Sequence, residues 1–364
     1  MCGIFGVLGD TPAIDEIMEG LSRLEYRGYD SSGVAVLNDK KIESYRAEGK
    51  LLNLKKIISK KTVQGKIGIG HTRWATHGVP SEKNAHPHTT EQVAIVHNGI
   101  IENFSDLKND LVQKGHLFRS QTDSEVIAHL LTDFLDSGFS PEESIQKTLP
   151  KLEGAYAIAV LFRNNNLLVG ARRGSPLAFG LNDKKFYLGS DSVALSPFTQ
   201  KVCFLEEGDS VFIRESSFVV YDIQYSKVER KISMTSHTGA GVGKGNFSHF
   251  MQKEIYEQPS VIGDSLSRYI DPLKKKINIP NININWKKIR KINLVACGTS
   301  YYACLTATYW LQKYSKISCI AELASEFRYK EFISSDDQVT IFISQSGETA
   351  DTLAALRYAK SKKA

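Results

Sequence analysis

Over the first 220 or so residues, short apolar runs alternate with stretches whose apolar residues recur at helical spacing. The runs have the length and flanking turn residues of strands, and they cover 4–8, 33–37, 93–97, 155–162, 167–172 and 211–214. Apolar residues at 14, 17, 18, 21 and 24 predict a helix, with Thr11 as its N-cap and Pro12 at its first position. A second helix is expected from Thr122, where T-D-S-E reads as a capping box. Many strands and few helices predict packed sheets flanked by helices.

The pattern changes after residue 290 to strand, loop and helix in turn. KINLVA (291–296) runs into CGTS and a helix from about Tyr301 to Lys313, and QVTIFI (338–343) runs into SQSGET and another helix. Apolar strands that alternate with helices predict a parallel, doubly wound sheet. Such a sheet usually needs more strands than the last 75 or so residues provide, so we expect this domain to be incomplete at Ala364.

The intervening segment reads as a connector. GAGVGKG (239–245) is not a phosphate loop, because Thr238 stands where the first glycine is required and Gly245 follows the lysine. The basic stretch 274–291 carries one aromatic residue, Trp286, whereas a nucleic-acid surface needs interleaved aromatics or a folded motif. We therefore expect domains at 2–220 and 289–364, joined by a linker at 221–288 with a helical part.

Composition narrows the class of protein only modestly. The hydrophobic content of 41%, the charged content of 24% and the net charge of +6 are ordinary for a globular chain and do not point to nucleic acid. No run approaches the roughly 18 apolar residues of a membrane helix, and no signal peptide opens the chain. The five cysteines show no C-x-x-C pairing, which is typical of a reducing compartment. We expect a cytoplasmic protein that binds neither membrane nor nucleic acid.

The opening MCGIFGVLGD places a thiol directly behind the initiator methionine. Methionine is commonly removed before a small second residue, and its removal would leave Cys2 with a free α-amine. That amine has a pKa near 8, so it can take the thiol proton directly or through a water. The sequence therefore predicts Cys2 as an N-terminal nucleophile.

Four further positions suit the attack of a thiolate on an amide of an amino-acid substrate. The Asn98 amide and the Gly99 N–H could stabilise an oxyanion, although Asn-Gly is also a common turn. Arg73 in HTRWATHG (71–78) could fork onto an α-carboxylate, and Asp123 could meet an α-ammonium group. An acid in the first turn of a helix also favours the helix dipole without any ligand, so both interpretations of Asp123 stay open.

Two other kinds of ligand are weighed from the same sequence. The histidines of this region (His71, His77, His86, His88 and His97) lack accompanying acids in ligand register, so no metal site is expected. The hydroxyl-rich loops 298–300 and 344–349 follow predicted parallel strands and precede helices, which suits a phosphate group, although they could be simple helix caps. Neither loop matches G-x-G-x-x-G, so a dinucleotide is not indicated.

Taken in order, the motifs resemble one family, the glutamine–fructose-6-phosphate aminotransferases. The resemblance rests on MCGIFG, LEYRGYDSSGVAV, HTRWATHG, NAHPH, VHNGIIEN, TDSEVIAHL, MQKEIYEQP, ACGTSYYA and SQSGETADT, and it covers essentially the whole chain. It implies a four-layer α+β N-terminal-nucleophile hydrolase sandwich of class II glutamine amidotransferases, followed by a partial α/β doubly wound sugar isomerase domain.

The resemblance also implies roles for individual residues. Cys2 would be the nucleophile, with Asn98 and Gly99 forming the oxyanion hole. Glutamine would be bound by Arg73 and Asp123, with Trp74 gating the site and Thr76 and His77 nearby. Fructose 6-phosphate would contact Thr299, Ser300, Ser344, Gln345, Ser346 and Thr349. Ammonia from L-glutamine would aminate D-fructose 6-phosphate to D-glucosamine 6-phosphate, with no metal or organic cofactor, in a full-length homodimer.

One departure from the family limits these expectations. The family carries a second sugar isomerase domain and a C-terminal tail, and neither follows Ala364, so we expect this chain to hydrolyse glutamine without completing the synthesis alone. Alternatives are another class II amidotransferase or a non-catalytic sugar-phosphate-binding module. An amidophosphoribosyltransferase would carry a phosphoribosyl-pyrophosphate loop where this chain has SQSGET, and an asparagine synthetase would carry a nucleotide pyrophosphate loop, which is missing.

Overall fold

The computed structural model of the chain describes residues 2–75, 77–182, 184–235, 247–271, 276–277, 284–347 and 349–364. The chain divides into two units, Met1–Asn246 and Phe247–Ala364, each of which is described by itself. None of the helices in the described ranges is long and apolar enough to cross a membrane.

Two antiparallel sheets form the centre of the first unit. The first sheet has the order β15 (Ile232–Met234), β11 (Lys201–Phe204), β9 (Ala178–Asn182), β10 (Lys185–Gly189), β1 (Gly3–Leu8), β4 (Ile67–Arg73), β2 (Ser31–Asn38) and β3 (Lys41–Glu48). The second has the order β14 (Lys227–Val228), β13 (Ser217–Tyr221), β12 (Ser210–Arg214), β8 (Leu168–Arg173), β7 (Gly154–Phe162), β6 (Val93–Ile101) and β5 (His88–Thr89). The strands predicted from the apolar runs all form. Three of them (β1, β7 and β12) are one residue longer than expected, β2 and β6 are three and four residues longer, and β8 is shifted by one residue.

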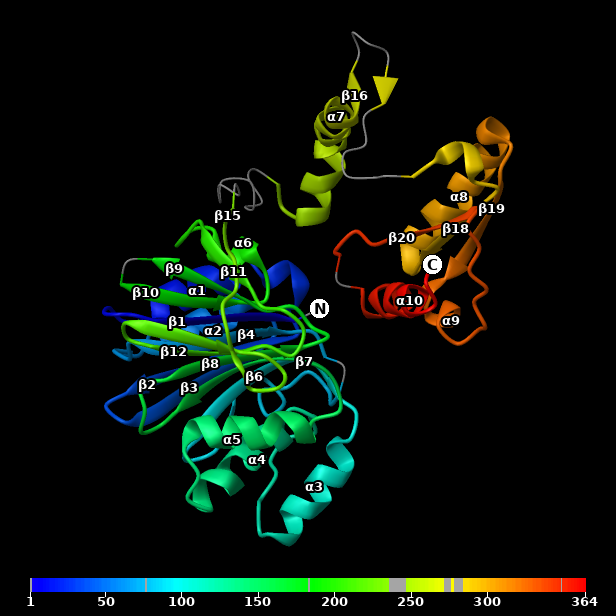
Figure 1. The fold of residues 1–364 in the computed structure, drawn as a ribbon. Coiled ribbons are helices and arrows are strands. Elements are labelled where there is room, and N and C mark those ends of the chain that lie inside the picture. The colour runs from blue at the N-terminus through cyan, green and yellow to red at the C-terminus, as the bar shows by residue number, and fades with distance from the viewer. Residues whose placement is uncertain are drawn as a thin grey trace. The chain divides into compact units, whose positions relative to one another are not determined.

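Helices cover the outer face of each sheet. Helices α1 (Ile14–Ser22), α2 (Leu51–Ile58) and α6 (Ser192–Leu195) pack on the first sheet, and α3 (Phe104–Gln113), α4 (Glu125–Asp136) and α5 (Pro141–Thr148) pack on the second (Figure 1). A third apolar cluster, which includes Ile4, Ile69 and Val96, fills the space between the sheets. The predicted four-layer sandwich is therefore confirmed. Short 3-10 helices lie at Glu25–Arg27 and Leu149–Lys151.

Both predicted helix starts in this unit are wrong in detail. Helix α1 begins after Ala13, which makes no side-chain cap, so neither Thr11 nor Pro12 has its predicted place. Helix α4 begins at Glu125 and not at Thr122, whose hydroxyl instead lies 2.9 Å from Nε2 of His88. The Glu125 carboxylate accepts N–H groups from residues 119 and 120. The side chains of Thr122 and Glu125 therefore bind other parts of the fold instead of forming a local capping box.

The second unit contains the predicted parallel sheet. Its order is β19 (Ser318–Leu323), β18 (Lys291–Ala296) and β20 (Gln338–Ile343). Helix α8 (Gly298–Ser315) packs on one face, while α9 (Ala324–Phe327) and α10 (Ala350–Ser361) pack on the other, as a doubly wound sheet requires. Earlier in this unit lie α7 (Phe250–Tyr269), the hairpin of β16 (Ile270–Asp271) and β17 (Lys276–Ile277), and a 3-10 turn at Trp286–Lys288. The glycine cluster at 239–245 lies outside the described residues.

Candidate active site

Cys2 lies at the start of β1, where the pairing of Gly3 with Thr72 brings it beside the end of β4. The backbone N–H of Trp74 donates to Sγ of Cys2 over 3.2 Å, and Sγ lies 3.4 Å from the carbonyl oxygen of Trp74. Gly3 permits this close pairing, because a Cβ there would lie 2.6 Å from Cβ of Leu24 and from Oγ1 of Thr72. The thiol is thus held by backbone that comes from a distant part of the sequence.

The charge balance around the thiol is set by burial and by its neighbours. Burial raises the pKa of the Cys2 thiol, while the Trp74 N–H and the Arg73 guanidinium act in the opposite direction. Asp30 also raises this pKa, and its Oδ2 accepts the N–H of Ala75 over 2.7 Å. The neutral thiol therefore dominates near pH 7, and attack requires a base that takes its proton.

Asn98 reaches Cys2 from the second sheet. Its Nδ2 donates to the Cys2 carbonyl oxygen over 3.1 Å. Asn98 and Gly99 lie inside β6 and not in a turn, which removes the turn interpretation of this dipeptide. Gly99 has φ of +126°, and a Cβ there would lie only 2.0 Å from the carbonyl oxygen of Ala155. Glycine is therefore required at 99 by both conformation and space.

The two groups expected to hold the ends of glutamine are both buried near the thiol. The Arg73 guanidinium donates to the carbonyl oxygens of His77, Gly78 (3.2 Å) and Val79 (3.5 Å). Burial lowers the pKa of Arg73. The charges of Cys2, Asp30 and Asp123 act in the opposite direction and raise it. Oδ2 of Asp123 accepts the N–H of Ile101 over 2.8 Å. Asp123 precedes α4, so its bond is to the end of β6 and not to a helix start.

The remaining glutamine-site predictions lie on the loop after β4. The Trp74 side chain is 45% exposed and meets the edge of Tyr29, with ring centroids 5.6 Å apart. The half-buried ring of His77 packs on the ring of Phe104, with ring centroids 5.6 Å apart. Thr76 lies outside the described residues.

Sequence reasoning missed the groups that support these side chains. Asp30 orients the backbone next to Trp74, and the fully buried His71 lies 3.0 Å from Oδ1 of Asn98. Burial lowers the pKa of His71 and of His88 to about 3, so both rings stay neutral. Within the described residues, no group of three or more His, Cys, Asp or Glu side chains could hold a metal ion. For His71, the available signal was a polar residue at a buried position of a strand.

In the second unit, the two predicted phosphate loops lie at the carboxyl ends of the parallel strands. Adjacent strands β18 and β20 end in register, with Ala296 opposite Ile343, so the loops that follow them start side by side. Ser344 accepts the N–H of Gly347 over 3.0 Å and lies 3.0 Å from the Thr349 hydroxyl. Thr299 and Ser300 lie in the first turn of α8. Exposed N–H and hydroxyl groups at helix starts suit an anionic group.

Gln345 is exposed and Ser346 half-buried in the loop after β20. Gly298 and Gly347 have φ of +58° and +69°, a left-handed conformation that glycine adopts without strain. The structure therefore brings all six predicted sugar-phosphate residues to the same edge of the sheet.

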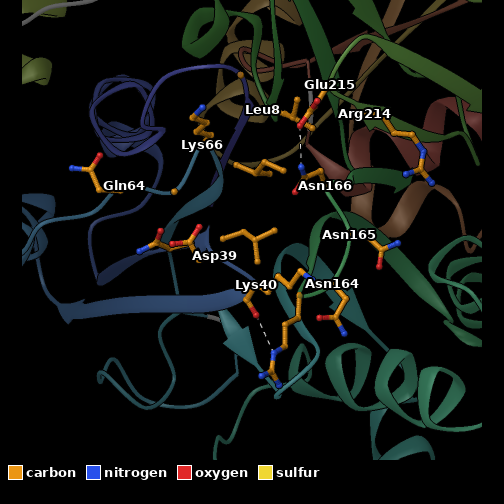
Figure 2. Close-up of a pocket in the computed structure, with 16 residues that line it drawn as sticks. Leu8, Asp39, Lys40, Gln64, Lys66, Asn164, Asn165, Asn166, Arg214 and Glu215 are labelled. Carbon is orange, nitrogen blue, oxygen red and sulfur yellow. Dashed lines mark hydrogen bonds between the residues drawn. The ribbon is translucent and has the colours of Figure 1, made fainter.

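A separate hollow lies at the other end of β1, where turns of both sheets meet (Figure 2). It has a volume of about 590 Å³ and is bordered by Leu8, Lys40, Lys66, Asn165 and Arg214 among others. None of the predicted site residues lines it, and Cys2 lies at the opposite end of the strand.

Comparisons with known proteins agree with the two-part fold. A family model described as a glutamine amidotransferase domain matches residues 71–197, and one described as a SIS domain matches residues 286–364. A glutamine–fructose-6-phosphate aminotransferase of Zymomonas mobilis is 49% identical over 99% of this chain and 60% of the relative. One from Bradyrhizobium diazoefficiens is 47% identical over 100% of this chain and 60% of the relative.

Among solved structures, a glutamine phosphoribosylpyrophosphate amidotransferase from B. subtilis matches with a TM-score of 0.55 and 21% identity, over 95% of this chain and 69% of that one. At this identity the match supports the fold alone. The chain spans about 60% of the length of the curated relatives it matches. With near-half identity along its whole length, the chain is similar to the glutamine–fructose-6-phosphate aminotransferases, and it carries a glutamine amidotransferase domain followed by a SIS domain.

Proposed function

We propose that the first unit hydrolyses L-glutamine to L-glutamate and ammonia with Cys2 as the nucleophile. In a chain that starts at Cys2, the α-amine takes the thiol proton and Sγ attacks the side-chain amide carbon of glutamine. The tetrahedral oxyanion is stabilised by the Asn98 amide and the Gly99 N–H. Its collapse breaks the C–N bond, the amine returns a proton to the leaving ammonia, and water then hydrolyses the γ-glutamyl thioester to glutamate.

One observation carries this proposal more than any other. Cys2 and Asn98 belong to different sheets and are 96 residues apart in sequence, yet Nδ2 of Asn98 donates to the Cys2 carbonyl oxygen over 3.1 Å. This bond brings an amide donor to the residue that carries the thiol, and an acyl-transfer nucleophile needs such a donor nearby. Apart from the N-terminal amine, no histidine or other base is required.

Arg73 and Asp123 supply the specificity for an amino acid. A guanidinium binds a carboxylate with two parallel N–H bonds, and a glutamine carboxylate would replace the loop carbonyls that Arg73 contacts here. Asp123 would take the α-ammonium group through its remaining oxygen. The loop that follows β4 would complete the pocket with Trp74, Thr76 and His77.

For the second unit we propose a binding site for D-fructose 6-phosphate, formed by Thr299, Ser300, Ser344, Gln345, Ser346 and Thr349. Support comes from the SIS-domain match and from the two loops that share one sheet edge. In a longer protein of this family, ammonia would then convert the sugar to D-glucosamine 6-phosphate. We place the domains at 2–220 and 289–364, with a linker at 221–288, in a cytoplasmic protein that is dimeric at full length.

The test is a glutaminase assay on the wild type, Cys2→Ala and a matched thiol control, Cys203→Ala. Cys203 is a buried core residue of β11 with no role in the site. The wild type should release glutamate and ammonia in equal amounts, Cys2→Ala should lose about 10³-fold or more in kcat, and Cys203→Ala should remain active. Absence of activity in the wild type would instead favour a non-catalytic sugar-phosphate-binding module.

A further inference from the structure

His71 is a buried polar residue that the proposed reaction does not use. It lies on β4 of the first sheet, opposite Ile4 of β1 and Gly33 of β2. Its ring crosses to the second sheet, where Nε2 lies 3.1 Å from the carbonyl oxygen of His97 and 3.0 Å from Oδ1 of Asn98. One ring nitrogen therefore faces two atoms of β6.

The chemistry of these atoms decides which one donates. The His97 carbonyl can only accept, so Nε2 must carry a hydrogen. The Asn98 atom that faces this N–H must then be its oxygen, because an NH2 group there would set two donors against each other. The Asn98 NH2 group is consequently turned towards Cys2, where it donates to the carbonyl oxygen over 3.1 Å.

The surroundings keep the ring in this state. Burial lowers the pKa of His71 to about 3, so the ring is neutral at working pH. Nδ1 has no hydrogen-bond partner among the described residues, so moving the hydrogen there would gain nothing and would leave a lone pair facing two oxygens. The ring also packs on His86, with ring centroids 4.3 Å apart.

We propose that His71 is a positioning residue, whose Nε2–H fixes the orientation of the Asn98 amide so that its NH2 group faces Cys2. His71 does not touch glutamine. The inference rests on the proposed glutaminase reaction and deepens it, because it says what holds the oxyanion-stabilising donor in place.

This role predicts a specific kinetic effect. An oxyanion donor acts on the transition state and not on bound glutamine, so its misorientation should lower kcat and leave KM unchanged. Loss of one such donor costs about 10²- to 10³-fold in kcat, which sets the upper limit for a residue that acts through it. We expect His71→Leu to lower kcat by about 10- to 100-fold.

His86→Leu is the matched control. His86 is also buried and stacks on His71, but neither of its ring nitrogens has a hydrogen-bond partner among the described residues. Both variants remove an imidazole from the same stack, and only one removes the bond to Asn98. We expect His86→Leu to keep kcat within about threefold of the wild type, by the same limit on indirect effects.

The deciding experiment measures glutaminase kcat and KM in the wild type, both variants, Asn98→Ala and the two double variants with Asn98→Ala. His71→Leu should add no further loss once Asn98→Ala is present, because the two residues act as one unit. The inference is overturned if His71→Leu keeps the wild-type kcat, if it loses no more than His86→Leu, or if its loss is fully retained in the Asn98→Ala background.

Two further arms keep the result unambiguous. If His71→Leu does not fold, as judged by circular dichroism, His71→Phe takes its place, since its ring fills the same space without an N–H donor. A kcat loss in His71→Phe that vanishes in the Asn98→Ala background supports the inference, while wild-type kcat or an additive loss overturns it. An inactive wild type would instead count against the proposed glutaminase function itself.

Discussion

Gly28 offers a direct test of how tightly the nucleophile is positioned. It follows the 3-10 turn Glu25–Arg27 in an ordinary extended conformation, so alanine there causes no backbone strain. The added Cβ would lie 2.7 Å from the carbonyl carbon of Arg73 and 3.0 Å from the Trp74 nitrogen, which donates to Sγ of Cys2. Since ordinary contacts begin near 3.4 Å, this backbone must move by about 0.7 Å.

The displacement sets the expected size of the effect. A misplacement of about 1 Å in a catalytic arrangement can cost about 100-fold in rate, so Gly28→Ala should lower kcat/KM for glutamine by about 10- to 100-fold. Overpacking should lower the free energy of unfolding by about 1–3 kcal/mol. Gly6→Ala is the control, because a Cβ at this β1 position would lie no closer than 3.4 Å to its neighbours.

The assay combines steady-state glutamate release with urea denaturation of both variants. Gly6→Ala should stay within about threefold of the wild-type kcat/KM, because its Cβ meets only ordinary contacts. Tight positioning of the nucleophile is ruled out if Gly28→Ala keeps the wild-type kcat/KM, or if both glycine variants lose activity equally.

Three further predictions concern charge. Burial acts to raise the pKa of Glu125, but hydrogen bonds from His129 and the preceding loop lower it to about 2, against a usual 4.5. Glu125→Gln should therefore lower the free energy of unfolding, measured by urea denaturation at pH 7, by about 3 kcal/mol. This difference should fade as the pH falls from 4.5 towards 2. Asp209 is fully buried and holds Arg230 with two 2.8 Å bonds, so Asp209→Asn should lower the free energy of unfolding by about 3–5 kcal/mol in the same assay. Because burial raises the pKa of the Cys2 thiol, its alkylation by iodoacetamide should accelerate about tenfold per pH unit from pH 7 to about 8.5.

Each of these has a clear opposite result. A Glu125→Gln deficit that is the same at pH 7 and pH 3 would show that the carboxylate charge is not what stabilises the fold. An Asp209→Asn variant as stable as the wild type would mean that the Arg230 pair contributes nothing measurable. An alkylation rate that levels off below pH 8 would place the Cys2 pKa below its ordinary value.

The strands were predictable because the apolar runs that form them can be recognised in the sequence without knowledge of their partners. Residues 93–97 and 155–162 read as strands in isolation, and they pair as β6 and β7. The helix starts were less predictable, because Thr122 and Glu125 form their hydrogen bonds with His88 and with the preceding loop. A local pattern such as a capping box cannot reveal a distant partner that satisfies the same atoms.

Prediction of the site follows the same division. Cys2, Arg73 and Asn98 could be proposed because their side chains carry recognisable chemistry at motif positions. The supporting contacts could not, since they join segments far apart in sequence, as the bond between Asp30 and the Ala75 N–H and that between His71 and Asn98 do. Pairing across two sheets decides these contacts, and a single sequence gives no register between them.

In the proposed reaction, Cys2 carries the glutamyl group during turnover. The most direct measurement is an acid quench of the protein during glutamine hydrolysis, followed by peptide mass spectrometry. We expect the mass of one γ-glutamyl group on the peptide that begins at Cys2, with Met1 removed, and no such adduct in Cys2→Ala. An adduct on another residue, or undiminished glutamine hydrolysis by Cys2→Ala, would contradict it.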